Sequence, residues 1–270
     1  MRNIATLKLL IKRALNFRVP GKYSRVRKND IFLVSYPKSG NTWLRFIIGN
    51  LISEKEVDFN NFNNIIPDMH QTLKKKLDKY QSPRIIKSHL SYTKSYPKVI
   101  YIYRDPRDVV ISYYYWHKKY DKNFNLTIEQ YIEKFIQGKN SIYGSWQQHY
   151  YSWVNSPLNE RNKLLILKYE DIKANEFSEV HKIVDFLSLN VNRQEIEKAI
   201  ENSKFDKMQN LEKKQTSTSE YLKNSRHDIR FVRSGKSQWR DYFTSDLTKK
   251  FKSKFGDTLI ELDYESDFNW

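Results

Sequence analysis

The chain has 270 residues, no cysteine and a net charge of +17 from 48 basic and 31 acidic side chains. Hydrophobic residues make up 39% of it, which suffices for a large core and excludes a disordered or low-complexity chain. The lack of cysteine excludes disulfide scaffolds, thiolate metal sites and cysteine nucleophiles. The positive charge favours an anionic partner, such as nucleic acid, an anionic membrane or a phosphate-bearing ligand, although abundant Lys, Asn, Ile and Tyr also indicate an AT-rich genome.

Residues 1–27 form a basic segment with a helical pattern. Ile4, Leu7, Ile11 and Leu15 share one face of a helix, and basic side chains lie opposite. Basic residues interrupt the apolar run, so the segment is a poor signal peptide, and no stretch of the chain is long enough to cross a membrane. We predict a helix that packs against the rest of the protein, and membrane contact through residues 1–20 is the less favoured alternative.

Strands and helices alternate through the remainder, residues 28–270. Short apolar runs predict strands at 31–36, 84–87, 98–103 and 163–168. Apolar residues at helical spacing predict helices at 42–54, from Pro106 onward, and at 127–137, 143–154, 176–187 and 193–201. The pattern indicates a single α/β domain over 28–270, with a central parallel sheet flanked by helices. The stretches 55–82 and 206–236 show little periodicity, and we expect loops there, the second as a lid.

The first predicted strand leads into the sequence Tyr36-Pro-Lys-Ser-Gly-Asn-Thr-Trp43. A tight turn at Gly40 followed by a helix N-terminus presents free backbone N–H groups to an anion. Lys38 supplies a positive charge, and Ser39 and Thr42 supply hydroxyl groups. The Walker A spacing is absent because Lys38 precedes the only glycine of the loop. The loop therefore predicts a P-loop-like site for phosphate or a related oxyanion.

A second anion site is predicted at the end of the third strand. Arg104 follows that strand directly, and Ser112 comes two helical turns later. A guanidinium group and a hydroxyl group together are suited to bind a phosphate. Ligands of open α/β sheets bind at the carboxyl ends of the strands, where Arg104 is expected. We assign Asp105 and Asp108 to capping of the helix that starts nearby.

His89 ends the second predicted strand, within Lys87-Ser-His89. Of the six histidines, it is the one expected at the ligand-binding end of the sheet, which makes it the candidate general base. The histidines at 117, 149 and 181 lie in helical patterns and are assigned to the surface or to packing. No pair of histidines has the spacing of a helical metal site, so we predict no metal.

Together these segments resemble the cytosolic-type sulfotransferases, which use 3′-phosphoadenosine 5′-phosphosulfate (PAPS) as donor. Residues 36–43 are similar to the phosphosulfate loop of that family. Arg104 with Ser112 resembles the pair that binds its 3′-phosphate. Lys87-Ser-His89 resembles its Lys-Thr-His segment, whose histidine is the catalytic base. Three further segments are similar to family motifs in the same order, at 168–171, 203–208 and 233–244.

The resemblance implies a set of site residues. The implied catalytic residues are His89 as base, with Lys38 and Lys87 as stabilisers of the developing charge. The residues implied to bind PAPS are Lys38, Ser39, Gly40, Asn41, Thr42, Trp43, Arg104, Ser112, Tyr169, Ser203, Phe205, Arg233, Ser234 and Gly235. Asn41 and Ser234 depart from the Thr and Lys common in the family, and the last motif is one residue short between Gly235 and Trp239.

The implied reaction is in-line transfer of a sulfuryl group from PAPS to a hydroxyl group, without a metal, in the cytoplasm. The acceptor is a hydroxyl-bearing small molecule, a glycan or a lipid. We expect residues 55–82, 113–150 and 206–232 to determine which. No nucleic-acid partner is expected because the positive charge is scattered, and no oligomeric state is implied. Three alternatives stay open: a P-loop-like nucleotide or small-molecule kinase, a basic nucleic-acid-binding protein, and an inactive sulfotransferase-like fold.

Overall fold

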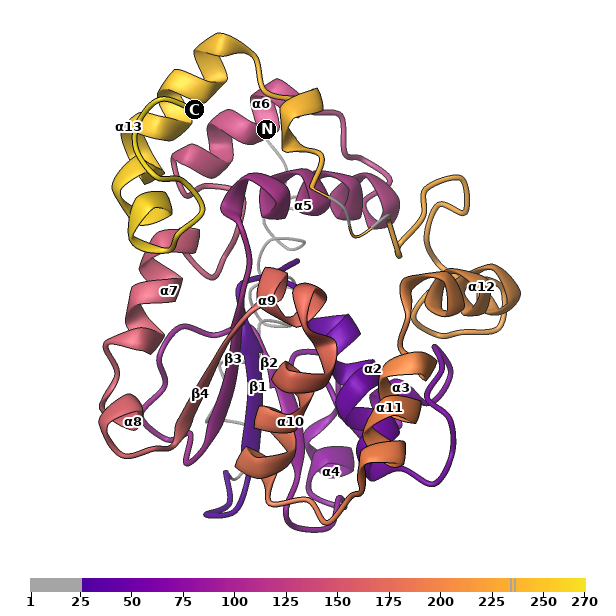
Figure 1. Ribbon diagram of the computed structural model, residues 1–270. Helices are drawn as coiled ribbons and strands as arrows, with labels where there is room; N and C mark the ends of the chain where they lie inside the picture. Colours follow the sequence, from indigo (N-terminus) through magenta and orange to yellow (C-terminus); the bar gives the residue numbers. More distant parts are fainter. Residues whose placement is uncertain (1–25, 234, 236) are drawn as a thin grey trace, which may run out of the picture.

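The computed structural model describes residues 26–233, 235 and 237–270. Its centre is a four-stranded parallel sheet in the order β2-β1-β3-β4 (Figure 1). The strands are β1 (Ile31–Ser35), β2 (Ile85–Ser88), β3 (Val99–Tyr103) and β4 (Leu164–Lys168). All four predicted strands and the α/β fold with a central parallel sheet are confirmed. The predicted helix near the N-terminus lies almost wholly outside the described residues.

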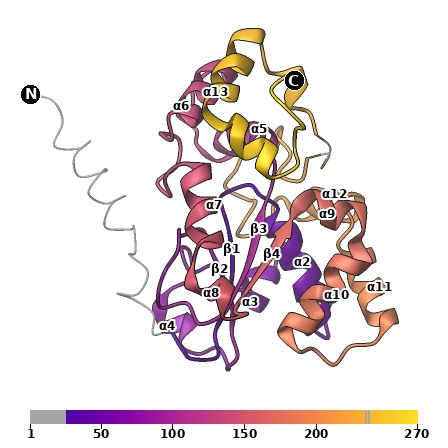
Figure 2. The same ribbon diagram turned by 60° about the vertical axis from the view of Figure 1, so that its left-hand side comes forward.

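Helices cover both faces of the sheet, as Figures 1 and 2 show. The first seven are α2 (Asn41–Ile52), α3 (Phe62–Ile65), α4 (Lys74–Leu77), α5 (Pro106–Tyr120), α6 (Ile128–Ile136), α7 (Trp146–Val154) and α8 (Pro157–Glu160). The others are α9 (Tyr169–Ala174), α10 (Glu176–Leu187), α11 (Arg193–Asn202), α12 (Phe205–Gln215), a 3₁₀ turn at Trp239–Asp241 and α13 (Ser245–Glu261). The six predicted helices are confirmed. Within the described ranges, no helix is both long and apolar enough to span a membrane.

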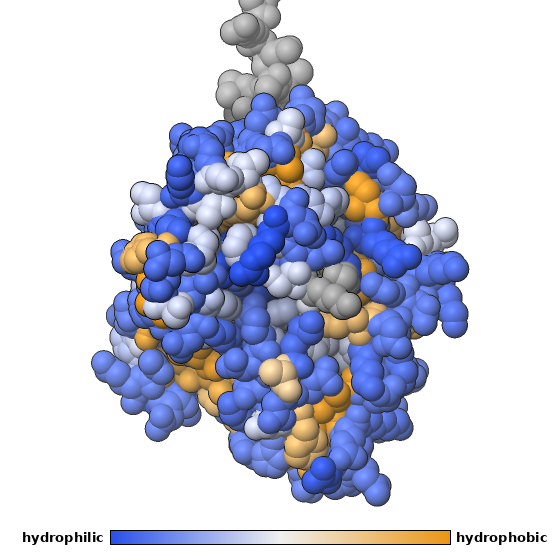
Figure 3. Space-filling view, turned by 45° about the horizontal axis from the view of Figure 1, so that its top comes forward, coloured by the Kyte–Doolittle hydropathy of each residue, from blue (hydrophilic) through white to orange (hydrophobic). Residues whose placement is uncertain are grey.

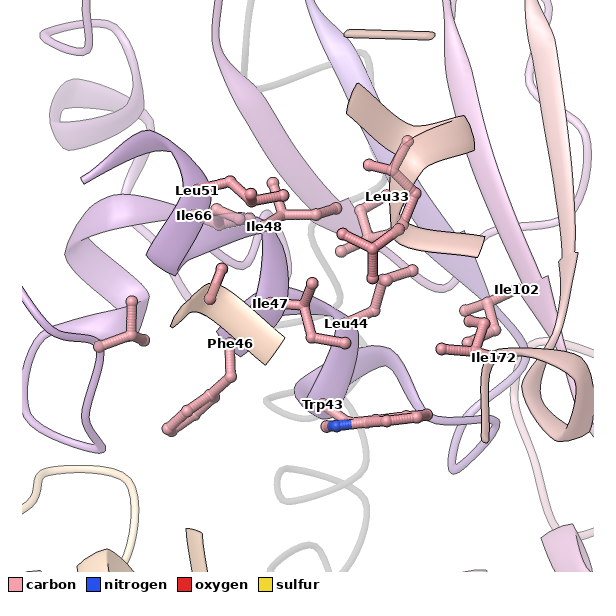
Figure 4. Close-up of a cluster of buried hydrophobic side chains, with 14 of the residues drawn as sticks. Leu33, Trp43, Leu44, Phe46, Ile47, Ile48, Leu51, Ile66, Ile102 and Ile172 are labelled. Carbon is pink, nitrogen blue, oxygen red and sulfur yellow. The ribbon is translucent and has the colours of Figure 1, made fainter. Parts of the chain in front are cut away.

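The strands alternate their side chains between two hydrophobic cores, because successive residues of a strand point to opposite faces. Leu33 and Ile102 face a core built with α2, α10 and α11, part of which Figure 4 shows. Phe32 and Tyr101 face the other core, which α5, α6, α7 and α13 complete. Burial on both faces explains why the strands are nearly continuous apolar runs in the sequence.

The expectation of loops at 55–82 and 206–236 is wrong in part. Helix α12 occupies Phe205–Gln215, and the short helices α3 and α4 lie within 55–82. Helix α12 packs only a few apolar residues, among them Met208 and Leu211, against the core, and because most of its other residues are polar the segment resembles a loop in composition. Helix α13 also goes unpredicted, although Phe251, Phe255 and Leu259 on one face of it are fully buried.

The amino end of the sheet is closed by a buried ion pair. Arg84 donates to both carboxylate oxygens of Asp30, at 2.8 and 2.5 Å, and to the backbone carbonyl of Leu77 at 2.9 Å. Asp30 is fully buried and Arg84 is 2% exposed. The hydrogen bonds and the opposite charge satisfy the guanidinium group here, so Arg84 ties the segment before β1 to the segment before β2.

Candidate active site

A pocket of about 240 Å³ opens at the carboxyl end of the sheet. Figure 3 shows this end of the molecule, where hydrophilic residues cover most of the face. The predicted site residues that line the pocket are Lys38, Gly40, Asn41, Thr42, Trp43, Lys87, His89, Arg104, Ser112, Tyr169, Phe205, Arg233 and Gly235. Ser39 and Ser203 are buried beside it without lining it, and Ser234 lies outside the described residues.

The loop between β1 and α2 needs left-handed backbone at two positions. Lys38 has φ 72° and Gly40 has φ 99°. A Cβ atom on Gly40 would lie 2.6 Å from a ring carbon of Tyr169, so glycine is required there by both conformation and space. The side-chain amide of Asn41 donates to the backbone carbonyl of Leu33 at 3.3 Å and ties the helix start to the strand. The loop is therefore fixed around the open N-terminus of α2.

Three aromatic rings form one wall of the pocket. The ring centre of Trp43 lies 5.4 Å from that of Tyr169 and 5.4 Å from that of Phe205. The indole N–H of Trp43 donates to the backbone carbonyl of Ser203 at 3.0 Å, while the Ser203 hydroxyl donates to the carbonyl of Ala199 at 2.7 Å. Ser203 thus anchors Trp43, and the rings provide an aromatic surface beside the loop.

Positive charge dominates the lining, with five cationic side chains and one carboxylate among the described residues. The nearest carboxylate oxygen to the Arg104 guanidinium belongs to Asp108, at 3.9 Å, and the buried Nε of Arg104 has no partner in the described part of the chain. The Lys38 ammonium lies 4.5 Å from the centre of the Phe231 ring. Burial, followed by repulsion from Arg104 and other cations, lowers the pKa of Lys38 to about 7. Such a lining favours an anionic ligand.

Lys87 is the one of these cations with a close anionic partner. Its ammonium lies 2.8 Å from Oδ2 of Asp68, and both side chains are buried. Burial by itself would raise the pKa of Asp68, but Lys87, together with His70 and Arg45, outweighs it and holds that pKa below its ordinary value. Asp68 therefore stays ionised and fixes the position of Lys87.

The imidazole of His89 is held so that one nitrogen is free. Its Nδ1 lies 2.7 Å from the backbone carbonyl of Ser35, and because a carbonyl only accepts, we assign the hydrogen to Nδ1. The backbone N–H of His89 donates to Nε2 of His70 at 3.0 Å, and its carbonyl accepts from Nε2 of His149 at 3.1 Å. Burial, then Lys87 and His70, hold the pKa of His89 well below its ordinary value. The Nε2 lone pair is thus left as a base.

Of the residues assigned to roles outside the site, His149 and Asp105 have the predicted roles, whereas Asp108 does not cap α5. His149 is fully buried, as predicted for a packing residue, and it also fixes the backbone of His89. Asp105 caps α5 by accepting the backbone N–H of Arg107 at 2.8 Å. Asp108 instead accepts the backbone N–H of Gln238 at 3.0 Å.

Sequence patterns missed a group of pocket residues in the segment 66–71. Asp68, His70 and Gln71 line the pocket, although this stretch has neither a periodic pattern nor a motif. Residues 67–69 run along β2, where the N–H of Lys87 donates to the carbonyl of Pro67 and the N–H of residue 69 donates to the carbonyl of Lys87. The only local signal is a run of side chains that can form hydrogen bonds, shortly before the strand that precedes His89. Among the described residues, no group of three or more His, Asp or Glu side chains is placed to hold a metal.

Residues 28–263 match the family model described as a sulfotransferase domain. The chain belongs to the sulfotransferase family. It is similar to Sulfotransferase 1B1 of Canis lupus familiaris, with 32% identity over 253 residues that cover 83% of this chain and 81% of that relative. It is also similar to Sulfotransferase 2A1 of Homo sapiens, with 31% identity over 257 residues and 88% of each chain covered.

Solved structures agree with this family. A crystal structure of mouse sulfotransferase SULT7A1 complexed with PAP is similar with a TM-score of 0.70 and 27% identity, covering 90% of this chain and 88% of that one. Retinol dehydratase in complex with androsterone and inactive cofactor PAP has a TM-score of 0.74 at 20% identity, covers 92% of this chain and 84% of that chain, and shows the fold alone. The predicted sulfotransferase resemblance and the enzyme class are confirmed, and the kinase alternative is not favoured.

Proposed function

We propose that the enzyme transfers a sulfuryl group from PAPS to a hydroxyl group of an acceptor, with His89 as the general base. The observation that carries this proposal is the convergence, in one pocket, of cations without close carboxylate partners and the free Nε2 lone pair of His89. Lys38 and Arg104 supply the charge that a doubly anionic nucleotide requires, and His89 supplies the base. Both features come from the ends of neighbouring strands, where ligands of this fold class bind.

The nucleotide is proposed to lie across the loop after β1 and the start of α5. The 5′-phosphosulfate meets Lys38 and the N–H groups of residues 40–43, and the 3′-phosphate meets Arg104 and Ser112. One buried group without a partner in the described residues, Nε of Arg104, supports this fit, since a 3′-phosphate would offer it an acceptor. The wall of Trp43, Tyr169 and Phe205 is suited to the adenine ring.

Two further groups of residues complete the proposed nucleotide site. Arg233 and Gly235 line the pocket, and a Cβ on Gly235 would lie 2.8 Å from the Phe205 ring, so the chain passes close to the aromatic wall there. Ser203 and Ser234 stay predictions that rest on the resemblance alone.

In the proposed step, the acceptor hydroxyl gives its proton to Nε2 of His89 while its oxygen attacks sulfur. The bond between sulfur and the bridging phosphate oxygen breaks, and adenosine 3′,5′-bisphosphate (PAP) leaves with the electron pair. Lys38 and Lys87 stabilise the charge that builds on the leaving oxygen and the sulfuryl oxygens. Asp68 keeps Lys87 oriented for this role, so positioning and electrostatics provide most of the rate enhancement.

The proposed acceptor is a hydroxyl-bearing small molecule, a glycan or a lipid, because a neutral histidine base suits a hydroxyl group. The proposed compartment is the cytoplasm, and this rests only on the resemblance of the motifs to cytosolic-type sulfotransferases.

The test is transfer of ³⁵S from labelled PAPS to a panel of acceptors, together with calorimetric titration of PAP. His89→Ala is expected to lower kcat by about 10²–10⁴-fold, the range for loss of a general base, and to change the Kd for PAP by less than about twofold. His181→Ala is the matched control, because His181 is exposed on α10. Normal turnover by His89→Ala would show that the base is wrongly assigned.

A further inference from the structure

The pocket has a second part, beside the imidazole of His89. The ring centres of His70, His89 and Tyr143 lie 5.3 to 6.0 Å from one another. An acceptor oxygen that gives its proton to Nε2 of His89 must approach this group of rings. We call this region the acceptor subsite, with Asp68, His70, Gln71, Tyr113, Trp116 and Tyr143 as its lining.

The segment that carries His70 and Gln71 is held in place by the protein itself. Arg45, which is 3% exposed, donates to the side chain of Asn63 at 2.6 Å and to the backbone carbonyls of Phe62 and Ile66. Its guanidinium also stacks on the Phe62 ring at 4.2 Å. The turn before residue 68 is therefore fixed to α2, so the polar groups that follow it are presented in a defined place.

Three polar groups of the acceptor subsite form no hydrogen bond within the described part of the chain and are open to solvent: the amide of Gln71, which is an exposed residue, the Tyr143 hydroxyl and Nδ1 of His70. Because Nε2 of His70 accepts the backbone N–H of His89, its hydrogen lies on Nδ1, which is a donor. Burial lowers the pKa of His70 to about 4, so this imidazole is neutral near pH 7. The subsite thus offers uncharged donors and acceptors.

The charged groups next to the subsite are held by the protein. Asp68 and Lys87 pair at 2.8 Å, and the Arg45 guanidinium donates to backbone carbonyls and to Asn63, whereas the unpaired cations Lys38 and Arg104 belong to the nucleotide side. The rings of Tyr113, Trp116 and Tyr143 add flat apolar faces. An apolar acceptor would cover the polar groups without pairing them, and each such loss weakens binding, whereas hydroxyl groups would satisfy them.

We propose that the acceptor is an uncharged ring compound with several hydroxyl groups, a sugar or a cyclic polyol, one hydroxyl of which receives the sulfuryl group. This inference rests on the proposed sulfotransferase reaction and narrows its acceptor class. Neighbouring hydroxyls of the ring pair with Gln71, His70 and Tyr143, while the C–H faces of the ring pack on the aromatic side chains.

The test compares acceptors of matched ring size with the full chain and labelled PAPS. Methyl β-D-glucoside and myo-inositol offer several hydroxyls, cyclohexanol offers one, and a 3-hydroxysteroid offers one on a large apolar frame. We expect kcat/KM for the glucoside or inositol to exceed that for cyclohexanol at least about tenfold, the effect of one additional satisfied polar group. A preference for cyclohexanol or the steroid, or transfer to none of the four while PAP binds, would overturn the inference.

Variants locate the effect in the subsite. Gln71→Ala is expected to raise KM for the preferred polyol about tenfold, with kcat and the Kd for PAP changed less than about twofold. Gln81→Ala is the matched control, since Gln81 is an exposed glutamine before β2, at the other end of the sheet. An unchanged KM in Gln71→Ala would contradict the inference. If the proposed function itself is wrong, the result is different: the folded protein does not bind PAP.

Discussion

The two ends of the parallel sheet differ in whether a carboxylate lies close to the buried cations. At the amino end, Arg84 is matched by the carboxylate of Asp30 at 2.5 Å and is nearly inaccessible to solvent. At the carboxyl end, Arg104 has its nearest carboxylate at 3.9 Å, and Lys38 faces an aromatic ring and other cations. At the amino end, a carboxylate thus neutralises the buried cation. At the carboxyl end, positive charge is in excess, and we propose that the nucleotide binds there.

The same contrast occurs within four residues of one segment. Arg107 donates to both carboxylate oxygens of Asp105, pairs with Glu265 and stacks on Trp239 at 4.3 Å. Arg104, three residues earlier, keeps a buried Nε without a partner among the described residues. Since taking an unpaired charge out of water is costly, a cation left so in a pocket indicates that an anionic ligand completes it.

The largest expected effect is at the amino end. Arg84→Ala should lower the free energy of unfolding by about 3–5 kcal/mol, because it leaves the Asp30 carboxylate buried without a counter-charge. Urea unfolding followed by tryptophan fluorescence measures this. In the double variant Asp30→Leu with Arg84→Leu, we expect a smaller loss than the sum of the two single changes. Additive losses would contradict the pairing.

At the carboxyl end, removal of a cation should change the affinity for PAP and not the free energy of unfolding. Arg104→Ala should weaken PAP binding by about 1.5–3 kcal/mol, the range for hydrogen bonds to charged groups, while the free energy of unfolding changes little. Titration calorimetry and urea unfolding of the same preparation separate the two quantities. Arg193→Ala on the exposed face of α11 controls for the loss of one positive charge. If Arg104→Ala bound PAP with unchanged affinity, or lost as much stability as Arg84→Ala, the proposed difference between the two ends of the sheet would be contradicted.

We expect pH to have a smaller effect on the affinity for PAP. The pKa of Lys38 is about 7 in the ligand-free pocket, and a bound anion favours the charged form and raises that pKa. The complex therefore holds more protons than the free protein, so affinity is full below pH 7 and falls as pH rises. The Kd for PAP should rise up to about tenfold per pH unit above 7, equal to about 1.4 kcal/mol per unit. Calorimetry in buffers of different ionisation enthalpy measures the proton uptake. Lys38→Met should abolish the slope, and a flat profile between pH 7 and 9 in the unaltered protein would contradict this role.

The sequence predicts the parts of the molecule that depend on local pattern. The four strands, the loop at 36–43 and the pair of Arg104 and Ser112 are each contained in one short segment, so composition and spacing suffice to find them. The position of His89 at a strand end follows from the same pattern.

Features that depend on contacts between distant segments were not predictable. The tautomer of His89 is set by Ser35 and its backbone by His70 and His149, from three other segments. The acceptor subsite depends on the pairing of residues 67–69 with β2, and no periodic pattern in the sequence predicts this pairing. Helix α12 is stabilised by the packing of a few apolar residues and by Glu212, which accepts the backbone N–H groups of residues 231 and 232. These interactions exist only once the chain has folded.

The central claim is that the unpaired cations at the carboxyl end of the sheet bind a nucleotide with two separate phosphate groups. The most direct measurement is a calorimetric titration of the full chain with PAP and, in parallel, with adenosine 5′-monophosphate, which lacks the 3′-phosphate. We predict saturable binding of one PAP per chain, at least about tenfold tighter than adenosine 5′-monophosphate, because we propose that Arg104 and Ser112 bind the 3′-phosphate, which adenosine 5′-monophosphate lacks. Equal affinity for the two nucleotides, or no binding of PAP to the folded protein, would contradict the account.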